Sequence, residues 1–257
     1  MSVEAFVLRG KTALVIGASN AIGRACALAL AEAGADVAIT TMLTNRQDED
    51  AINISLVELL ALGRKGFAQQ LDAAHVGAAE AVVQRTVAEL GRLDILVNAQ
   101  DLPYAKPVTD MTPDEWRRVL DVNLTGPALA CRAAAGPMLR QGKGRMINVI
   151  SLLGERGITN GSAYCAAQAG VLNLTRALAL EWARSGVTVN AIGAGWTEGM
   201  GMIADAALKQ QLARYIPHKR LAQPDDISAA AVYLASDSTG FISGQVIWID
   251  GGVRSRL

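Results

Sequence analysis

The stretch "TALVIGASNAIGRACALALAEAGADVAITT", residues 12–41, decides the fold. A β-branched run closes on Gly17, a segment with helical apolar spacing follows over 21–35, and "DVAITT" (36–41) is a second buried strand. Strand, helix and strand in this order form a crossover between parallel strands. Gly17 allows a tight turn, and Gly23 lets the helix approach the sheet closely. The stretch therefore predicts the first βαβ unit of a parallel sheet.

The rest of the chain keeps the same alternation of strand and helix. Strands separated by helices of this length predict a doubly wound, Rossmann-type parallel sheet of the α/β class. No linker or repeat divides the chain, so residues 1–257 form one domain, with a loop-rich substrate region at 196–220. The further strands are expected at 66–72, 93–99, 144–151, 186–195 and 245–252, and the helices at 47–62, 75–90, 113–140, 163–184 and 224–235.

Composition excludes several classes of function. The 24 basic and 24 acidic residues give a net charge of zero with no long run of either sign, which argues against a nucleic-acid or membrane-surface partner. No stretch reaches the ~18 apolar residues of a membrane span. The three cysteines (Cys26, Cys131 and Cys165) have apolar helical contexts without metal-ligand spacing. They indicate a reducing, cytoplasmic location and no metal site.

The turn "GASNAIG" (17–23) precedes a helix N-terminus, which is a ready site for a pyrophosphate. Glycines at such turns are also common for steric reasons alone, so the motif needs further support. Ala21 occupies the slot where a third glycine would let a cofactor come closest. The turn predicts a dinucleotide site that is narrower than usual.

Several further motifs follow the first turn in a fixed order along the chain. With "GASNAIG" (17–23), they are Asp72, "VNAQ" (97–100), "VNLTG" (122–126), the pair Ser151 and Tyr164, "VNAIGAGW" (189–196) and "RLAQPDDISAAAVYLASDSTGFISGQVIWIDGG" (220–252). Together these motifs resemble the short-chain dehydrogenase/reductase family over essentially the whole chain. In that family a tyrosine exchanges the substrate proton, a serine orients the substrate oxygen and an asparagine holds a water. A lysine four residues after the tyrosine binds the nicotinamide ribose and lowers the tyrosine pKa.

The resemblance implies an NAD(P) cofactor, a small-molecule substrate and two sets of site residues. The catalytic set is Asn123, Ser151, Tyr164 and, at the place of the lysine, Gln168. The cofactor-binding set is Gly17, Ser19, Asn20, Ile22, Gly23, Thr41, Asp72, Asn98, Gly195 and Thr197. Thr41 stands where an acidic residue would select NAD, so a threonine at this position weakly favours NADP.

Gln168 removes the charge on which the family's chemistry depends. A free tyrosine titrates near ~10, too high for an efficient base at neutral pH. A cation about 5 Å away at an effective dielectric constant of ~20 would favour the phenolate by roughly 3 kcal/mol, or ~2 pKa units. The amide of Gln168 can donate hydrogen bonds to ribose hydroxyls but supplies none of this energy.

Other departures fall on positions that the family turns toward its cofactor. Gln100 replaces the glycine beside the adenosine ribose, Ala194 a proline, and Gly199 a threonine that binds the carboxamide or the phosphates. Together with Ala21 and Gln168 they indicate a domain that kept its shape while its dinucleotide site weakened.

Three hypotheses follow from this pattern. The first is a weakly catalytic or non-catalytic subunit of a tetramer assembled through helices 113–140 and 163–184. The tetramer is a homo-tetramer or, with an active paralogue, a hetero-tetramer. In the family such mixed tetramers occur, for example, among dehydrogenases of hydroxyacyl thioesters. The second is an autonomous NAD(P)-dependent alcohol or ketone oxidoreductase in which Gln168 replaces the lysine. The third is a cofactor-independent, lyase-like enzyme.

Overall fold

The computed structural model describes residues 6–42, 46–72, 75, 77–201, 203 and 205–255. Its centre is a seven-stranded parallel sheet with the order β3-β2-β1-β4-β5-β6-β7. The order reverses between β1 and β4, as the doubly wound α/β class requires. The strands are β1 (Thr12–Ile16), β2 (Asp36–Thr41), β3 (Ala68–Gln70), β4 (Ile95–Asn98), β5 (Gly144–Ser151), β6 (Val187–Ala194) and β7 (Val246–Ile249).

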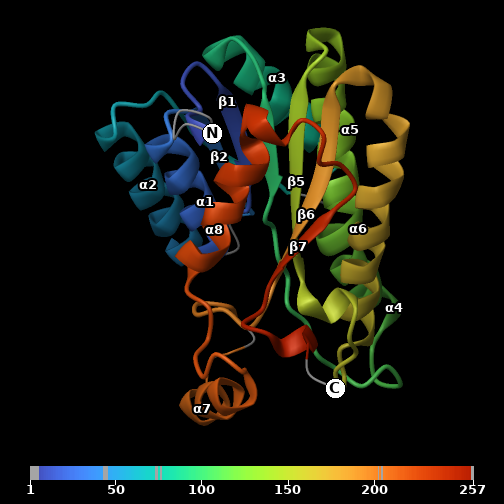
Figure 1. Cartoon of the computed structure of the whole chain (residues 1–257). Helices are drawn as coiled ribbons and strands as arrows, with labels where there is room; N and C mark the ends of the chain where they lie inside the picture. The colour runs from blue at the N-terminus through green and yellow to red at the C-terminus, as the bar shows by residue number, and fades with distance from the viewer. Residues whose placement is uncertain are drawn as a thin grey trace.

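Helices cover both faces of the sheet (Figure 1). The layer of α1, α2 and α8 encloses one hydrophobic core, and the layer of α3, α5 and α6 encloses another on the opposite face. These are the two layers of a single Rossmann-type domain, as predicted. The helices are α1 (Ala21–Glu32), α2 (Arg46–Ala61), α3 (Ala78–Leu90), α4 (Pro113–Leu120), α5 (Gly126–Gln141), α6 (Ser162–Glu181), α7 (Ala206–Tyr215) and α8 (Pro224–Ala235).

Two predicted elements differ from those observed. The helix expected over 113–140 is interrupted by a π-helical turn at Asp121–Thr125, where the Asn123 amide donates to the carbonyl oxygen of Val119 at 3.0 Å. The region 196–220, expected to be loop-rich, contains α7, whose first turn is capped by the side chain of Asp205. In Figure 1, α7 lies at one end of the molecule, beyond the two layers.

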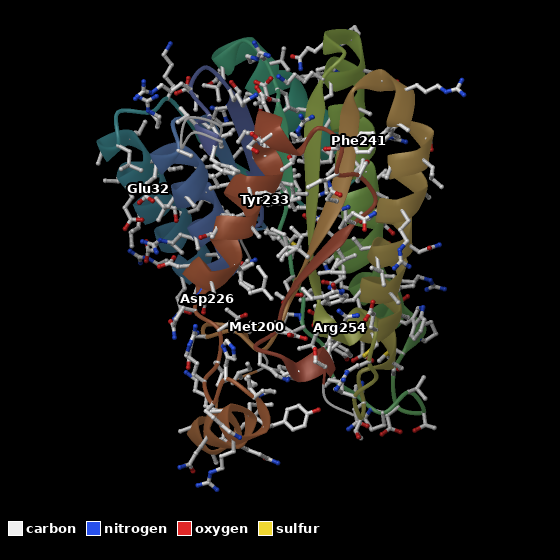
Figure 2. The ribbon with its side chains drawn as sticks, in the orientation of Figure 1. Glu32, Met200, Asp226, Tyr233, Phe241 and Arg254 are labelled. Carbon is white, nitrogen blue, oxygen red and sulfur yellow. The ribbon has the colours of Figure 1, made fainter. Side chains whose placement is uncertain are left out.

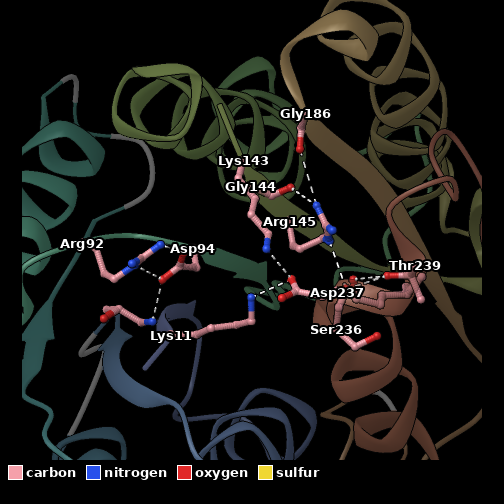
Figure 3. Close-up of polar contacts among 12 residues, drawn as sticks. Lys11, Arg92, Asp94, Lys143, Gly144, Arg145, Gly186, Ser236, Asp237 and Thr239 are labelled. Atoms are coloured by element: carbon pink, nitrogen blue, oxygen red, sulfur yellow. Dashed lines mark hydrogen bonds and ion pairs between the residues drawn. The ribbon is translucent and has the colours of Figure 1, made fainter. Parts of the chain in front are cut away.

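A charged cluster ties the N-terminal edge of the sheet together (Figure 3). The carboxylate of Asp237 accepts from Lys11 Nζ at 2.7 Å and pairs with Lys143 Nζ at 2.8 Å. Nearby, Arg92 forms an ion pair with Asp94 at 2.7 Å. This edge is opposite to the carboxyl ends of the strands, where ligands bind in doubly wound sheets. We therefore assign the cluster to stability.

Candidate active site

A cleft of about 320 Å³ lies at the carboxyl ends of the strands, at the switch point between β1 and β4. Its walls come from the turn after β1, the segment after β4, the end of β5, the first turns of α6 and the loop after β6. Elements far apart in sequence thus meet at the place where this fold binds ligands.

The turn after β1 has the conformation that the glycine motif predicted. Gly17 has φ +92°, and a Cβ there would lie 2.5 Å from the backbone nitrogen of Gln100. Asn20 caps α1 by accepting from the Gly23 N–H at 2.8 Å, and its amide donates to the carbonyl oxygen of Ala99 at 2.6 Å. The cap leaves the N-terminus of α1 at the edge of the cleft.

Ser151 and Tyr164 come together as predicted, at the end of β5 and in the first turn of α6. Tyr164 is only 1% exposed, and Ser151 lies near enough to its hydroxyl group to act towards a lower pKa of the phenol. The Ser151 Oγ accepts a hydrogen bond from the N–H of Leu153 at 3.2 Å. The pair therefore has fixed positions in the wall of the cleft.

The closest charged group to the phenol is a carboxyl group that the sequence analysis missed. Tyr164 Oη donates a hydrogen bond of 2.6 Å to Asp101 Oδ1. Burial, together with the charge of Asp101 and this hydrogen bond, raises the pKa of Tyr164 well above its usual value. Burial also raises the pKa of Asp101, against the opposing effect of the bond from Tyr164. Its place directly after the end of β4, at the same edge as Ser151, was the available signal.

Gln168 fills the place of the lysine without restoring its charge. Its side chain is 4% exposed, and its Oε1 accepts from the backbone N–H of Ser151 at 2.9 Å. The amide oxygen thus stabilises the end of β5. Nothing in this contact opposes the effect of Asp101 on the phenol of Tyr164.

Asn123 acts on the segment that carries Asp101. Its Oδ1 accepts from the N–H of Leu102 and its Nδ2 donates to the Leu102 carbonyl oxygen, both at 2.9 Å. With the third bond to Val119, the side chain is fully used by the backbone. The amide therefore holds the segment after β4 in place.

Gln100 lies in the wall of the same cleft with its amide unsatisfied. The residue is 6% exposed, and neither its Oε1 nor its Nε2 has a hydrogen-bond partner among the described residues. An unsatisfied buried amide costs about 1–3 kcal/mol. A polar ligand in the cleft is one way to recover that energy.

The predicted cofactor-binding residues divide into two groups. Gly17, Ser19, Asn20 and Ile22 line the cleft, and Gly23 lies directly against the backbone of Gly17, as close packing of helix on sheet requires. The remaining members do not line it. There are five of these. Thr41 is buried at the end of β2, Asp72 pairs with Arg118 at 3.3 Å, and Asn98 donates to Asn148 Oδ1 at 2.8 Å. Gly195 and Thr197 bind each other, since Thr197 Oγ1 donates to the carbonyl oxygen of Gly195 at 3.0 Å.

The side chains that line the cleft are neutral or acidic. Among the described residues that form the lining there is no lysine, arginine or histidine, whereas Asp48 and Asp101 are both present. A Cβ at Gly199 would lie 2.8 Å from the Cβ of Ala21, so the loop after β6 closes onto the first turn of α1. A pyrophosphate would meet the helix N-terminus without a cationic side chain and with little space.

Fold and site together define a Rossmann-type oxidoreductase scaffold with a serine–tyrosine pair in the cleft. The chain belongs to the short-chain dehydrogenase/reductase family: a family model described as "Enoyl-(Acyl carrier protein) reductase" matches residues 17–254. No cluster of metal-ligating side chains occurs among the described residues, nor does any helix there have the length and apolar character to cross a membrane.

Relatives of known name match over nearly their whole length. The chain is 36% identical to the 3-oxoacyl-[acyl-carrier-protein] reductase FabG of Staphylococcus aureus, over 95% of this chain and 98% of that protein. It is 37% identical to the cis-4-hydroxycyclohexanecarboxylate dehydrogenase of Sinomonas cyclohexanicum, over 97% and 98%. A gluconate 5-dehydrogenase from Burkholderia cenocepacia, in complex with NADP and tartrate, superposes with a TM-score of 0.90 at 30% identity over 99% of both chains. These relatives support NAD(P)-linked oxidoreduction as the family's chemistry and leave NAD and NADP undecided for this chain.

Proposed function

We propose that this protein is a short-chain dehydrogenase/reductase subunit whose own oxidoreductase turnover is weak or absent. It forms a homo-tetramer or, with an active paralogue, a hetero-tetramer. The observation that carries the proposal is the hydrogen bond of 2.6 Å from Tyr164 to Asp101. It puts a carboxylate beside the phenol, at a site where the family uses a cation.

The electrostatics act against a phenolate from two directions. The lysine that would favour it by roughly 3 kcal/mol is replaced by neutral Gln168. Burial disfavours the phenolate, and the negative charge of Asp101 disfavours it further. The general base of the family is therefore protonated at neutral pH, which supports slow chemistry in this chain alone.

Exposed apolar residues on the helices and at the sheet edge support assembly. Leu180 on α6 is 82% exposed. Phe241, which is labelled in Figure 2 and lies between α8 and β7, is fully exposed. The edge strand β7 is half-exposed along its length, although β6 beside it is buried. An unpaired strand at the edge of a sheet is a surface on which a second subunit can pack. We place the proposed tetramer contacts on α4–α5 and α6, and extend them to β7.

Substrate and cofactor follow from the relatives and the lining. We propose alcohols or ketones, including hydroxyacyl and 3-oxoacyl thioesters, as substrates of the assembly. Threonine at position 41 favours NADP over NAD, and the similar gluconate 5-dehydrogenase from Burkholderia cenocepacia holds NADP. Any dinucleotide that binds this chain is thus proposed to be NADP. A cytoplasmic location is part of the same proposal.

Autonomous oxidoreduction is the second candidate, favoured by the contact between Ser151 and Tyr164 in an accessible cleft. No observation favours the lyase-like alternative, which would need an arginine at position 168. The experiment that separates the first two is a calorimetric titration of the purified protein with NAD(H) and NADP(H). Binding absent at millimolar cofactor supports the impaired subunit; micromolar binding with turnover at ordinary dehydrogenase rates refutes it.

A further inference from the structure

We propose that Asp101 is the proton-exchanging group of this cleft, and that Tyr164 relays a proton between Asp101 and a ligand that carries an acidic hydroxyl group, an enol or a phenol. This assigns acid–base chemistry to a residue outside the family's motifs. It goes beyond the proposed function, because it needs no bound dinucleotide.

The geometry of the pair suits a relay. The separation of 2.6 Å between Tyr164 Oη and Asp101 Oδ1 is the length of a charge-assisted O–H···O⁻ bond. Tyr164 is held by α6, and the segment of Asp101 is held by the two bonds between Asn123 and Leu102. Both residues also line the cleft, so a ligand bound there would lie beside the pair.

Few other groups influence the pair. The pKa of Asp101 is shifted by burial and by Tyr164. The pKa of Tyr164 is shifted by burial, by Asp101, by the neutral hydroxyl group of Ser151 and by the thiol group of Cys165. Further along the segment after β4, Lys106 is engaged with Glu115 at 2.8 Å. A carboxyl group titrates at a pH far below that of a phenol. As the pH rises, Asp101 therefore loses its proton first, and Tyr164 remains protonated over the whole range in which Asp101 titrates.

The step balances without a co-reactant. The ligand hydroxyl gives its proton to Tyr164 Oη while the proton of Tyr164 passes to Asp101 Oδ1. Two O–H bonds break, on the ligand and on Tyr164, and two form, on Tyr164 and on Asp101. No electrons are exchanged, and the negative charge moves from Asp101 to the ligand oxygen. The ligand must be acidic enough to hold that charge, which selects enols and phenols over alcohols.

The unsatisfied amide of Gln100 independently indicates a polar ligand. It is 6% exposed, lines the same cleft and has no partner for its Nε2–H donors among the described residues. A ligand oxygen that gains negative charge is a suitable acceptor for such a donor.

The first test is a pH titration followed by infrared difference spectroscopy of the protonated carboxyl stretch. The wild type is expected to show a band that disappears with a midpoint above that of an ordinary aspartate, and Asp101→Asn to lack it. Tyr164→Phe should raise the midpoint, because the bond from Tyr164 stabilises the carboxylate. Asp48→Asn, in the same cleft, is the matched control. Persistence of the band in Asp101→Asn, or an unchanged midpoint in Tyr164→Phe, would overturn the assignment.

The second test uses 4-nitrophenol, whose absorbance reports its ionisation. At a pH below the phenol's own pKa, the wild type and Asp48→Asn should hold it more ionised than Asp101→Asn does, with thermal melts confirming that each variant is folded. Equal ionisation in Asp101→Asn, or no binding to the wild type, would refute the relay. Neither readout involves a cofactor, so the relay and the proposed subunit role can fail separately.

Discussion

Replacing Asn123 by alanine removes three hydrogen bonds of 2.9, 2.9 and 3.0 Å and leaves the N–H and carbonyl groups of Leu102 without their partners. An unsatisfied buried group costs about 1–3 kcal/mol, and because Leu102 is half-buried the lower part of the range applies to each group. We expect Asn123→Ala to lower the free energy of unfolding by about 2–4 kcal/mol. For a domain of this size that is a fall in Tm of roughly 5–15 °C.

Urea denaturation followed by circular dichroism measures the change directly. Thr125→Ala lies in the same π-helical turn but is exposed, so it should stay within about 0.5 kcal/mol of the wild type. Because Asn123 holds the segment of Asp101, the variant should also shift the titration midpoint of Asp101. A loss no larger than that of Thr125→Ala would refute the view that Asn123 fixes this segment.

Burial raises the pKa of Asp237, but its bonds to two lysines outweigh that effect and lower the pKa to about 2. The stabilisation by this carboxylate is therefore complete above pH ~4 and is lost as the pH falls through about 2. Acid unfolding of Asp237→Asn should depend less on pH in that window than acid unfolding of the wild type. An unchanged profile would contradict this. In Gly17→Ala the new Cβ would lie 2.5 Å from the backbone nitrogen of Gln100, on a backbone with φ +92°. The free energy of unfolding, measured by urea denaturation, should fall by roughly 2–5 kcal/mol. A fall below about 1 kcal/mol would refute the steric argument. Burial raises the pKa of Cys26 and Cys131 to about 12, so a disulfide reagent should modify neither thiol until urea is added. Rapid labelling of Cys26 or Cys131 in the native protein, located by peptide mapping to distinguish it from labelling of the partly buried Cys165, would contradict this.

The sequence predicted the sheet and its helices because alternating apolar strands and capped helices leave few arrangements. The meeting of Ser151 with Tyr164 followed from the same logic, since the end of β5 and the start of α6 lie at one edge of a parallel sheet. Helix α7 was missed although its sequence has a helical apolar period, because it is only ten residues long and none of those residues is buried in the core.

The place of Asp101 after β4 could be read from the sequence, but its contact with Tyr164 could not, for a different reason. The direction of a side chain just after a strand depends on the path of the following segment, and that path is set by Asn123, 22 positions further along. The role of Gln168 was predicted only in part. Its loss of charge was evident, but its bond to the backbone N–H of Ser151 depends on the spacing of two separate elements.

The close approach of Gly199 to Ala21 restricts which residues position 199 can accept. A threonine there would place its Cβ 2.8 Å from the Ala21 methyl group, on a backbone with φ +79° that disfavours any side chain. Glycine at position 21 would remove the methyl group but would leave that φ unchanged. Position 199 is therefore confined to glycine by two separate features, and a substitution at position 21 alone removes only one of them.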